Sequence, residues 1–302
     1  MATSPQLSVC LSFDFDATSV WIAETDNPAA ISRGEFGPYA IPRILRLLDK
    51  YDIKACFFVP GHTALAYPRE VCSIRDAGHE IGHHGWVHEN PAPLGRDRER
   101  EVFHRGLQAL ESVAGVHPVG YRSPSGDFTL TTIDLLLENG MLYDSSCSGS
   151  DFVPYYLRQG DRWSKTEPYE FGEPIDIVEV PFAWGLDDFP HMEFEVGWST
   201  EQSPPSTVRE IWQGEFDYAH ANAPGGVFDL CMHPQVIGRG SRLTMLEGLI
   251  AYMQSRPGVV FETMRAYAER WRVAHPLEEW KQSDSTHIGH AARPVETSTV
   301  AK

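Results

Sequence analysis

Short apolar runs alternate with longer amphipathic stretches along most of the chain, and this alternation limits the folds that the chain can adopt. Each apolar run has the length of a strand, and strands separated by helical stretches build parallel βαβ units. The glycine at the end of a helical stretch is a common helix C-cap, and Gly78, Gly115 and Gly140 stand at such positions. The expected strands cover residues 7–13, 53–60, 79–82, 119–123, 176–184, 226–234 and 258–263, and the expected helices cover 41–52, 69–78, 97–115, 131–140, 206–222 and 241–256.

About seven such units in one domain favour a barrel, complete or incomplete, over an open sheet. We therefore predict a single α/β domain over residues 1–275, followed by a polar tail over 276–302 that is flexible or contacts a partner. Residues 143–175 and 185–205 lack periodicity and are expected to form long functional loops. Their aromatic residues could cover a site or belong to the core; these residues are Phe152, Tyr155, Tyr156, Trp163, Trp184 and Trp198.

Charge and cysteine usage narrow the classes of partner and compartment. The formal charge of −17 disfavours nucleic acid and anionic membranes as partners, because both require clustered Lys and Arg. Five cysteines without a CxxC motif indicate reduced thiols. The N-terminal residues lack the pattern of a secretory signal, and no apolar run reaches the ~18 residues of a membrane span. We expect a cytoplasmic protein.

Polar residues gather directly after the expected strands, where barrel enzymes place their chemistry. His84 and His88 follow one strand and are four residues apart, so on a helical turn they would share one face and one metal ion. Asp16, after the first strand, could supply a carboxylate oxygen. Two histidines and one carboxylate form a common catalytic metal set with positions left open for water and substrate. A solvated histidine turn is the alternative, and His83 is interpreted as a neighbour only.

Asp14 and His233 have the chemistry of proton transfer, and Arg122 could assist the first of them. Asp14 would point the same way as Asp16 on an extended strand and could take a proton from a metal-bound water. Arg122 could orient this base or form a surface ion pair. His233 ends an apolar strand and is a candidate general acid, although a lone histidine there is more often structural. Either Asp187 or Asp188 could hold its tautomer, and His62 is a further candidate for the site wall.

The segments SFDFD, HHGWVH, RSPSG, WGLDD and DLCMHP resemble, in order, the five motifs of the polysaccharide deacetylase (NodB homology) superfamily. The resemblance covers about residues 7–265. It implies a distorted (β/α)7 barrel and a divalent metal, usually zinc, although manganese, cobalt or nickel suit the same ligands. It also implies roles for six residues: a metal triad of Asp16, His84 and His88, the base Asp14, the arginine Arg122 of the third motif, and the acid His233.

Two departures from the family pattern point to one branch. Phe15 separates two acids that are usually adjacent, and Ser125 stands where an aromatic residue is usual. These features resemble the branch of cyclic imide hydrolases, allantoinase-like proteins and peptidoglycan-deacetylase-like proteins, which implies a homo-oligomer such as a tetramer. Residues 31–37, 82–91, 151–161 and 233–242 also resemble that branch.

The resemblance to this branch implies hydrolysis of a ring C–N bond in a small cyclic imide or ureide. The apparent lack of an export signal and the aromatic 143–205 region favour a small substrate, and Arg239 could hold a ring carbonyl or carboxylate. The alternative within the family is N-deacetylation of an acetylated amino sugar such as peptidoglycan or chitin. A non-catalytic carbohydrate-binding module is disfavoured, because both Asp14 and His233 are present.

Overall fold

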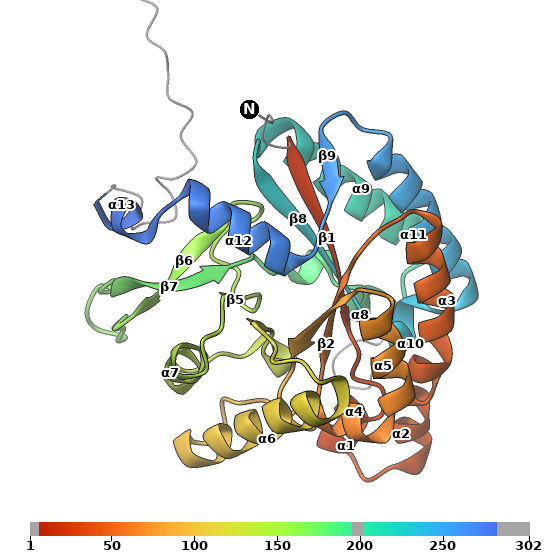
Figure 1. Cartoon of the computed structure of the whole chain (residues 1–302), viewed down its shortest axis with the longest axis horizontal. Coiled ribbons are helices and arrows are strands. Elements are labelled where there is room, and N and C mark those ends of the chain that lie inside the picture. Colours follow the sequence, from red (N-terminus) through yellow and green to blue (C-terminus); the bar gives the residue numbers. More distant parts are fainter. Residues whose placement is uncertain (1–5, 195–201, 283–302) are drawn as a thin grey trace, which may run out of the picture.

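A mixed sheet curls into a half-barrel with helices around it, which confirms the predicted distorted (β/α) barrel (Figure 1). The computed structural model describes residues 6–194 and 202–282. Its strands are β1 (Leu7–Asp14), β2 (Cys56–Val59), β3 (Glu80–His83), β4 (Gly120–Tyr121), β5 (Tyr143–Asp144), β6 (Tyr155–Gln159), β7 (Glu173–Glu179), β8 (Gly226–Met232) and β9 (Val259–Phe261). Their order is β6-β7-β5-β4-β3-β2-β1-β8, with β9 paired to β1. Among these strands, β6 and β7 pair antiparallel and the remaining pairs are parallel.

All six predicted helices are present, and the three predicted C-cap glycines have left-handed φ angles of 80°, 66° and 64° at Gly78, Gly115 and Gly140. The described helices are α1 (Ser19–Glu24), α2 (Pro28–Gly34), α3 (Phe36–Lys50), α4 (Gly61–Ala66), α5 (Pro68–Asp76), α6 (Arg96–Ala114), α7 (Leu130–Glu138), α8 (Asp188–Met192), α9 (Pro205–Asn222), α10 (Pro234–Ile237), α11 (Gly240–Gln254), α12 (Met264–Ala274) and α13 (Leu277–Gln282). Two short 3₁₀ turns, η1 (Pro124–Gly126) and η2 (Trp184–Leu186), lie near strand ends. None of the helices in the described parts of the chain is long and apolar enough to cross a membrane.

The two predicted loops contain more regular structure than their sequences indicated. Residues 143–175 hold β5, β6 and the hairpin into β7, and 185–205 holds α8. These elements are short and gain their stability from tertiary packing, so they leave little periodicity in the sequence. Phe152, Tyr155 and Tyr156 are buried core residues, whereas Trp163 is 63% exposed. Trp198 lies outside the described residues.

The predicted tail begins with a packed helix. Trp280 of α13 is buried, and its ring lies 5.4 Å from that of Trp271 and 5.7 Å from that of Tyr156. Residues 276–282 therefore continue the hydrophobic packing of the domain, while residues 283–302 lie outside the described part. The sequence failed to predict this packing because a single tryptophan among charged residues has no helical periodicity.

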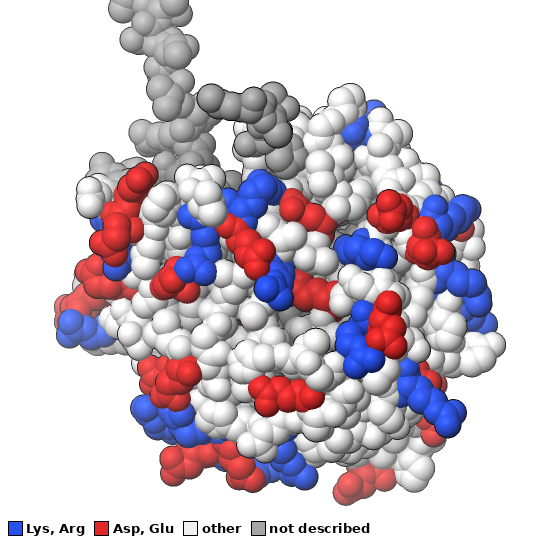
Figure 2. Space-filling model, viewed as in Figure 1, with Lys and Arg blue, Asp and Glu red and all other residues white. Residues whose placement is uncertain are grey.

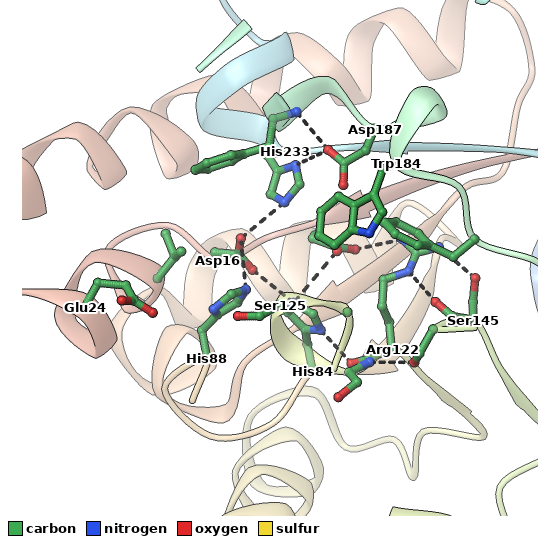
Figure 3. A pocket seen from close by; sticks show the side chains of 17 residues that line it. Asp16, Glu24, His84, His88, Arg122, Ser125, Ser145, Trp184, Asp187 and His233 are labelled. Carbon is green, nitrogen blue, oxygen red and sulfur yellow. Dashed lines mark hydrogen bonds and ion pairs between the residues drawn. The ribbon is translucent and has the colours of Figure 1, made fainter. Parts of the chain in front are cut away.

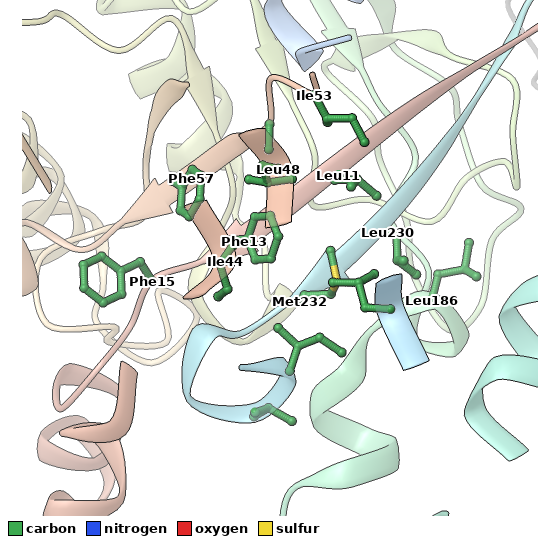
Figure 4. Close-up of a cluster of buried hydrophobic side chains, with 14 of the residues drawn as sticks. Leu11, Phe13, Phe15, Ile44, Leu48, Ile53, Phe57, Leu186, Leu230 and Met232 are labelled. Atoms are coloured by element: carbon green, nitrogen blue, oxygen red, sulfur yellow. The ribbon is translucent and has the colours of Figure 1, made fainter. Parts of the chain in front are cut away.

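Strand β1 divides the interior by the alternation of its side chains. Leu11 and Phe13 belong to the large hydrophobic cluster beneath α3, in which the Phe13 and Phe57 rings stack 4.8 Å apart (Figure 4). Residues two apart on a strand share a face, so Ser12 and Asp14 point to the opposite side. Strand β8 repeats the pattern, with Leu230 and Met232 in the same cluster as Phe13. Apolar packing on one face thus fixes the direction of the polar residues on the other.

The molecular face shown in Figure 2 carries acidic and basic side chains interspersed among uncharged ones. On the face that the figure shows, there is no continuous basic patch of the kind that binds nucleic acid.

Helix α6 lies against the turn after β3 at a glycine. A Cβ on Gly106 would overlap the backbone oxygen of Gly85, whereas a Cβ on Gly214 in α9 would have no neighbour within 4 Å. We predict that Gly106→Ala lowers the free energy of unfolding by about 1–3 kcal/mol through overpacking. Gly214→Ala, the matched control, should be neutral or stabilising by up to about 1 kcal/mol. Urea denaturation of both variants measures the difference, and equal stabilities would contradict the close approach of α6.

Candidate metal centre and active site

All six predicted site residues meet at the C-terminal ends of the parallel strands. They line one cavity of about 360 Å³ (Figure 3). Strand β1 delivers Asp14 and Asp16, the turn after β3 delivers His84 and His88, β4 is followed by Arg122, and β8 is followed by His233. The parallel sheet brings residues more than 200 positions apart into contact because its strand ends lie on one side of the barrel.

The turn that carries the two histidines differs from the predicted helical turn. Gly85 and His88 both have left-handed φ angles, of 69° and 67°. The turn is fixed by two backbone hydrogen bonds, from Gly61 N–H to the Gly85 carbonyl and from His62 N–H to the Trp86 carbonyl. A non-glycine residue such as His88 adopts this conformation only when its surroundings enforce it. The helical prediction was wrong, yet the two imidazole rings still lie 5.0 Å apart.

Asp16, His84 and His88 present ligand atoms to a common point, all within 4.8 Å of one another. His84 Nε2 lies 3.4 Å from Asp16 Oδ1, and His88 Nε2 lies 3.9 Å from Asp16 Oδ2. His84 Nδ1–H donates to the Arg122 carbonyl at 2.7 Å, which leaves the Nε2 lone pair directed toward Asp16. Within the described residues, both Asp16 carboxylate oxygens and His84 Nε2 are buried without a hydrogen-bond partner.

The protonation states of these residues suit a cation. Burial lowers the pKa of His84 and of His88, so both imidazoles are neutral and can donate a lone pair. Burial also raises the pKa of Asp16 well above its usual range, and the nearby Asp14 and Asp187 carboxylates add to this effect. Buried, unpaired acceptors of this kind are costly unless a positive charge compensates them. The residues therefore fit a divalent metal ion.

Two other groups in the described chain have the residue types of a metal site. One comprises Asp187, Cys231 and His233, and the other Asp144, Cys147 and Glu179. In the first, His233 Nδ1 is already bonded to a neighbouring carboxylate.

In the second group, Glu179 accepts the backbone N–H groups of Ser146 and Cys147, and none of its three members lines the cavity. Each group has at least one ligand atom already bonded, and Glu179 Oε2, which is buried without a partner, lies away from the cavity, so Asp16, His84 and His88 are the set that best fits a metal.

Asp14 is held beside this set by Arg122. Arg122 Nη1 donates to Asp14 Oδ1 at 2.9 Å, and Asp14 Oδ2 lies 3.8 Å from His84 Nε2. Burial by itself raises the pKa of Asp14, but Arg122, His84 and His233 outweigh it and hold that pKa below its usual value. Asp14 is thus an ionised carboxylate that can accept a proton at the edge of the metal set.

His233 stands opposite, with Nε2 3.5 Å from Asp16 Oδ2. Its Nδ1 lies 2.8 Å from Asp188 Oδ1 and 3.6 Å from Asp187 Oδ1, so Asp188 is the hydrogen-bond partner that the sequence left undecided. Burial lowers the pKa of His233, but the Asp187 and Asp188 carboxylates outweigh burial and raise it well above its usual value. His233 is therefore a protonated imidazolium that can donate a proton from Nε2.

A cage around Arg122 was missed by the sequence reasoning. Arg122 Nη2 donates to Asp229 Oδ2 at 2.7 Å and to Ser145 Oγ at 2.9 Å, while Nη1 also donates to Ser12 Oγ at 2.9 Å. A signal for Asp229 was available, because Asp229 and His233 are an even number of residues apart at the end of one apolar strand and share its inner face. Ser145 had no such signal, since it lies in a stretch without periodicity.

Other candidates lie apart from the cavity. His62 contacts Ser19 Oγ at 3.0 Å, and His83 contacts the Phe103 carbonyl at 2.9 Å beneath α6. Arg239 stacks on Phe36 and lines a different cavity. Of the aromatic residues expected to cover the site, Trp184 lines its wall, and two residues that the sequence did not single out, Phe182 and Phe189, line it as well.

Comparisons with known proteins give one consistent family. Residues 8–143 match the family model described as polysaccharide deacetylase. A peptidoglycan deacetylase of Helicobacter pylori is 34% identical over 295 residues, an alignment that covers 91% of this chain and 99% of that protein. A peptidoglycan deacetylase-like protein of Gibberella zeae is 29% identical, with 88% of this chain and 86% of that protein covered.

Solved structures agree with these relatives. A Mycobacterium smegmatis protein described among the polysaccharide deacetylases superposes with a TM-score of 0.80 at 34% identity, covering 91% of this chain and 93% of that one. An allantoinase superposes with a TM-score of 0.74 at 21% identity over 91% of this chain and 93% of its own. The latter likeness shows a shared fold alone.

We predict that His88→Ala weakens binding of a divalent metal by more than ~100-fold, because losing a ligand should cost more than the 10–100-fold typical of outer contacts. His62→Ala is the matched control, since His62 also follows a strand but lies outside the cavity. Elemental analysis after dialysis against a buffered metal concentration measures the metal retained by each variant. Retention of a full equivalent by the His88 variant would exclude His88 as a ligand.

Proposed function

The chain belongs to the polysaccharide deacetylase family, and from that premise we propose that it removes the acetyl group from an N-acetylated amino sugar by hydrolysis. The deacetylases of this family are hydrolases that act on C–N bonds other than peptide bonds, and they are generally metal-dependent. The observation that carries the proposal is the resemblance to a peptidoglycan deacetylase over almost the whole of both chains. In the cavity, Asp14 and His233 flank the residues that fit a metal.

The proposed chemistry divides between the metal and the side chains of the chain. A divalent metal held by Asp16, His84 and His88 would polarise the acetyl carbonyl and lower the pKa of a water molecule. Asp14, ionised beside Arg122, accepts the proton of the attacking water. His233, protonated at Nε2, donates a proton to the departing nitrogen. Zinc is the metal that we propose, because neutral imidazoles and one carboxylate suit it well.

Two residues hold the acid and the base in place. Asp188 accepts a hydrogen bond from His233 Nδ1 and also from the His233 backbone N–H at 3.0 Å, so both the ring and its backbone are oriented. Arg122 keeps Asp14 ionised and directed at the cavity through the bond from Nη1. The base and the acid therefore approach the scissile bond from different strands, β1 and β8.

Ring opening of a cyclic imide or ureide, which the sequence favoured, is the second candidate. The same base and acid serve both reactions, because each cleaves an amide C–N bond. The cavity favours this candidate in one respect, since about 360 Å³ walled by Phe182, Trp184 and Phe189 accommodates a small ring. The relatives nevertheless support deacetylation better, so ring opening takes second place. The homo-oligomer and the cytoplasmic location stay predictions.

The substrate prediction is tested by supplying both substrate classes to the zinc-loaded protein. Chito-oligosaccharides and peptidoglycan fragments are expected to release acetate, whereas succinimide, dihydrouracil and allantoin are expected to stay closed. Enzymatic acetate determination and ring-opening absorbance follow the two reactions in parallel. Ring opening without acetate would replace deacetylation by the second candidate. The zinc-loaded Asp14→Asn variant is the control, because it keeps the cavity and removes the base.

We predict that Asp188→Asn lowers kcat by about 10²-fold and leaves the metal content unchanged, because Asn supports His233 Nδ1–H less well and removes the charge that keeps the imidazole protonated. Asp187→Asn, the neighbouring variant, should lower kcat less, since Asp187 Oδ1 lies farther from the ring and caps α8 through the Phe189 N–H. Steady-state kinetics with metal analysis compare the two. A larger loss in the Asp187 variant would reverse the assignment.

A further inference from the structure

Glu24 is a carboxylate on the cavity wall with no role in the proposed chemistry. It is the last residue of α1 and lines the cavity at an exposed position. The other lining carboxylates are engaged, since Asp14 pairs with Arg122, Asp16 faces the two histidines, and Asp187 accepts the Phe189 N–H. Among the described residues, Glu24 forms no hydrogen bond or ion pair. Its charge is available to a bound substrate.

Apart from the general acid His233, the cavity offers a bound anion no cationic side chain that is free of a carboxylate partner, in the described part of the chain. Arg122 is the single Arg or Lys that lines it, and its two terminal nitrogens already bind Asp14 and Asp229. A substrate carboxylate beside Glu24 would therefore meet a like charge, and no Lys or Arg of the cavity lining is free to compensate it. Repulsion between the two negative charges disfavours binding of such a substrate. A cavity wall with a negative charge also raises the local concentration of cationic substrates.

Trp184 provides a complementary surface across the cavity. It is 44% exposed, and a Cβ on Gly126 would contact its ring, so the indole rests on the turn that follows Arg122. In the view of Figure 3, Glu24 and Trp184 lie on either side of Asp16 and His88. A cationic amine gains an ion pair beside the carboxylate or a cation–π contact on the indole face. A sugar ring can also lie against the indole.

We propose that Glu24 is a specificity-determining residue, which favours substrates with a cationic amine beside the scissile N-acetyl group and disfavours substrates with a carboxylate there. The inference rests on the proposed function, because it names the substrate class of the same active site. Its expected ligand is a partly deacetylated amino-sugar chain, in which a glucosamine unit neighbours an acetylated one. Each deacetylation would then create the charge that the enzyme recognises in the next substrate.

The test compares acetate release from three tetrasaccharides of N-acetylglucosamine type. One is neutral, one carries a single glucosamine unit, and one ends in an aldonic acid carboxylate. For the zinc-loaded wild-type protein, kcat/KM should rank amine above neutral above carboxylate. Glu24→Gln should lower the amine-to-carboxylate ratio about threefold to tenfold, since each charged substrate contributes an exposed ion-pair interaction. Glu24→Lys should invert the ranking.

The matched control is Glu210→Gln, an equal change of charge at an exposed position of α9 outside the cavity. It should keep the wild-type ratio. Raising the ionic strength should reduce the wild-type ratio toward that of Glu24→Gln, because salt screens exposed charges. Acetate release with equal ratios in wild type and Glu24→Gln would overturn the inference and leave the proposed function standing. Absence of acetate from all three substrates would overturn the proposed function, and the inference with it.

Discussion

The active site depends on the compensation of buried negative charge inside the half-barrel. Five carboxylates are buried around one centre, and two positive groups face them, Arg122 and the protonated His233; the carboxylates belong to Asp14, Asp16, Asp187, Asp188 and Asp229. Arg122 neutralises part of this charge by bridging Asp14 and Asp229. The Asp16 oxygens find no hydrogen-bond donor in the described chain, and burial raises the pKa of Asp16, so ionising this carboxyl without a cation is costly. Because unpaired buried charge is costly, a divalent cation at Asp16 would stabilise the folded site as well as serve the chemistry.

The two faces of β1 and β8 differ in polarity, because one face carries the buried charged groups and the other carries apolar side chains. One face packs against α3 and α11 in a dry hydrophobic cluster, and this packing fixes the register of the strands. A slip of one residue would place Asp14 in the hydrophobic cluster and Phe13 in the cavity. The apolar alternation therefore protects the geometry of the polar face. The positions of the polar side chains in the cavity therefore depend on the packing of the apolar side chains on the opposite face of the same strands.

The sequence predicted the barrel and most of the site because both leave regular signals. Apolar runs located all seven of the strands that were expected, and polar residues at their ends located the residues that line the cavity and that we propose as base, acid and metal ligands. It failed where structure comes from tertiary contacts alone. The turn at His88 adopts a left-handed backbone that only its hydrogen-bonded neighbours enforce, and β5 and β6 pair without a periodic pattern. Spacing in the sequence also could not show whether Asp187 or Asp188 bonds His233. The two residues are adjacent, and only the backbone conformation decides which side chain points at the ring.

In the account proposed here, the substrate is selected by elements that lie outside the candidate metal set. The residues after β1, β3 and β8 to which we assign the chemistry are the same for both candidate reactions, whereas α1 and the η2 turn place Glu24 and Trp184 on the cavity wall. Small changes there can separate amino-sugar chains from small rings without changes at Asp14 or His233.

The central claim is that Asp16, His84 and His88 hold the metal, and anomalous X-ray scattering from crystals of the zinc-loaded protein tests it most directly. The account predicts a peak at the zinc edge within ~2.0–2.2 Å of these three side chains. A peak instead between Asp187, Cys231 and His233, or between Asp144, Cys147 and Glu179, would contradict it.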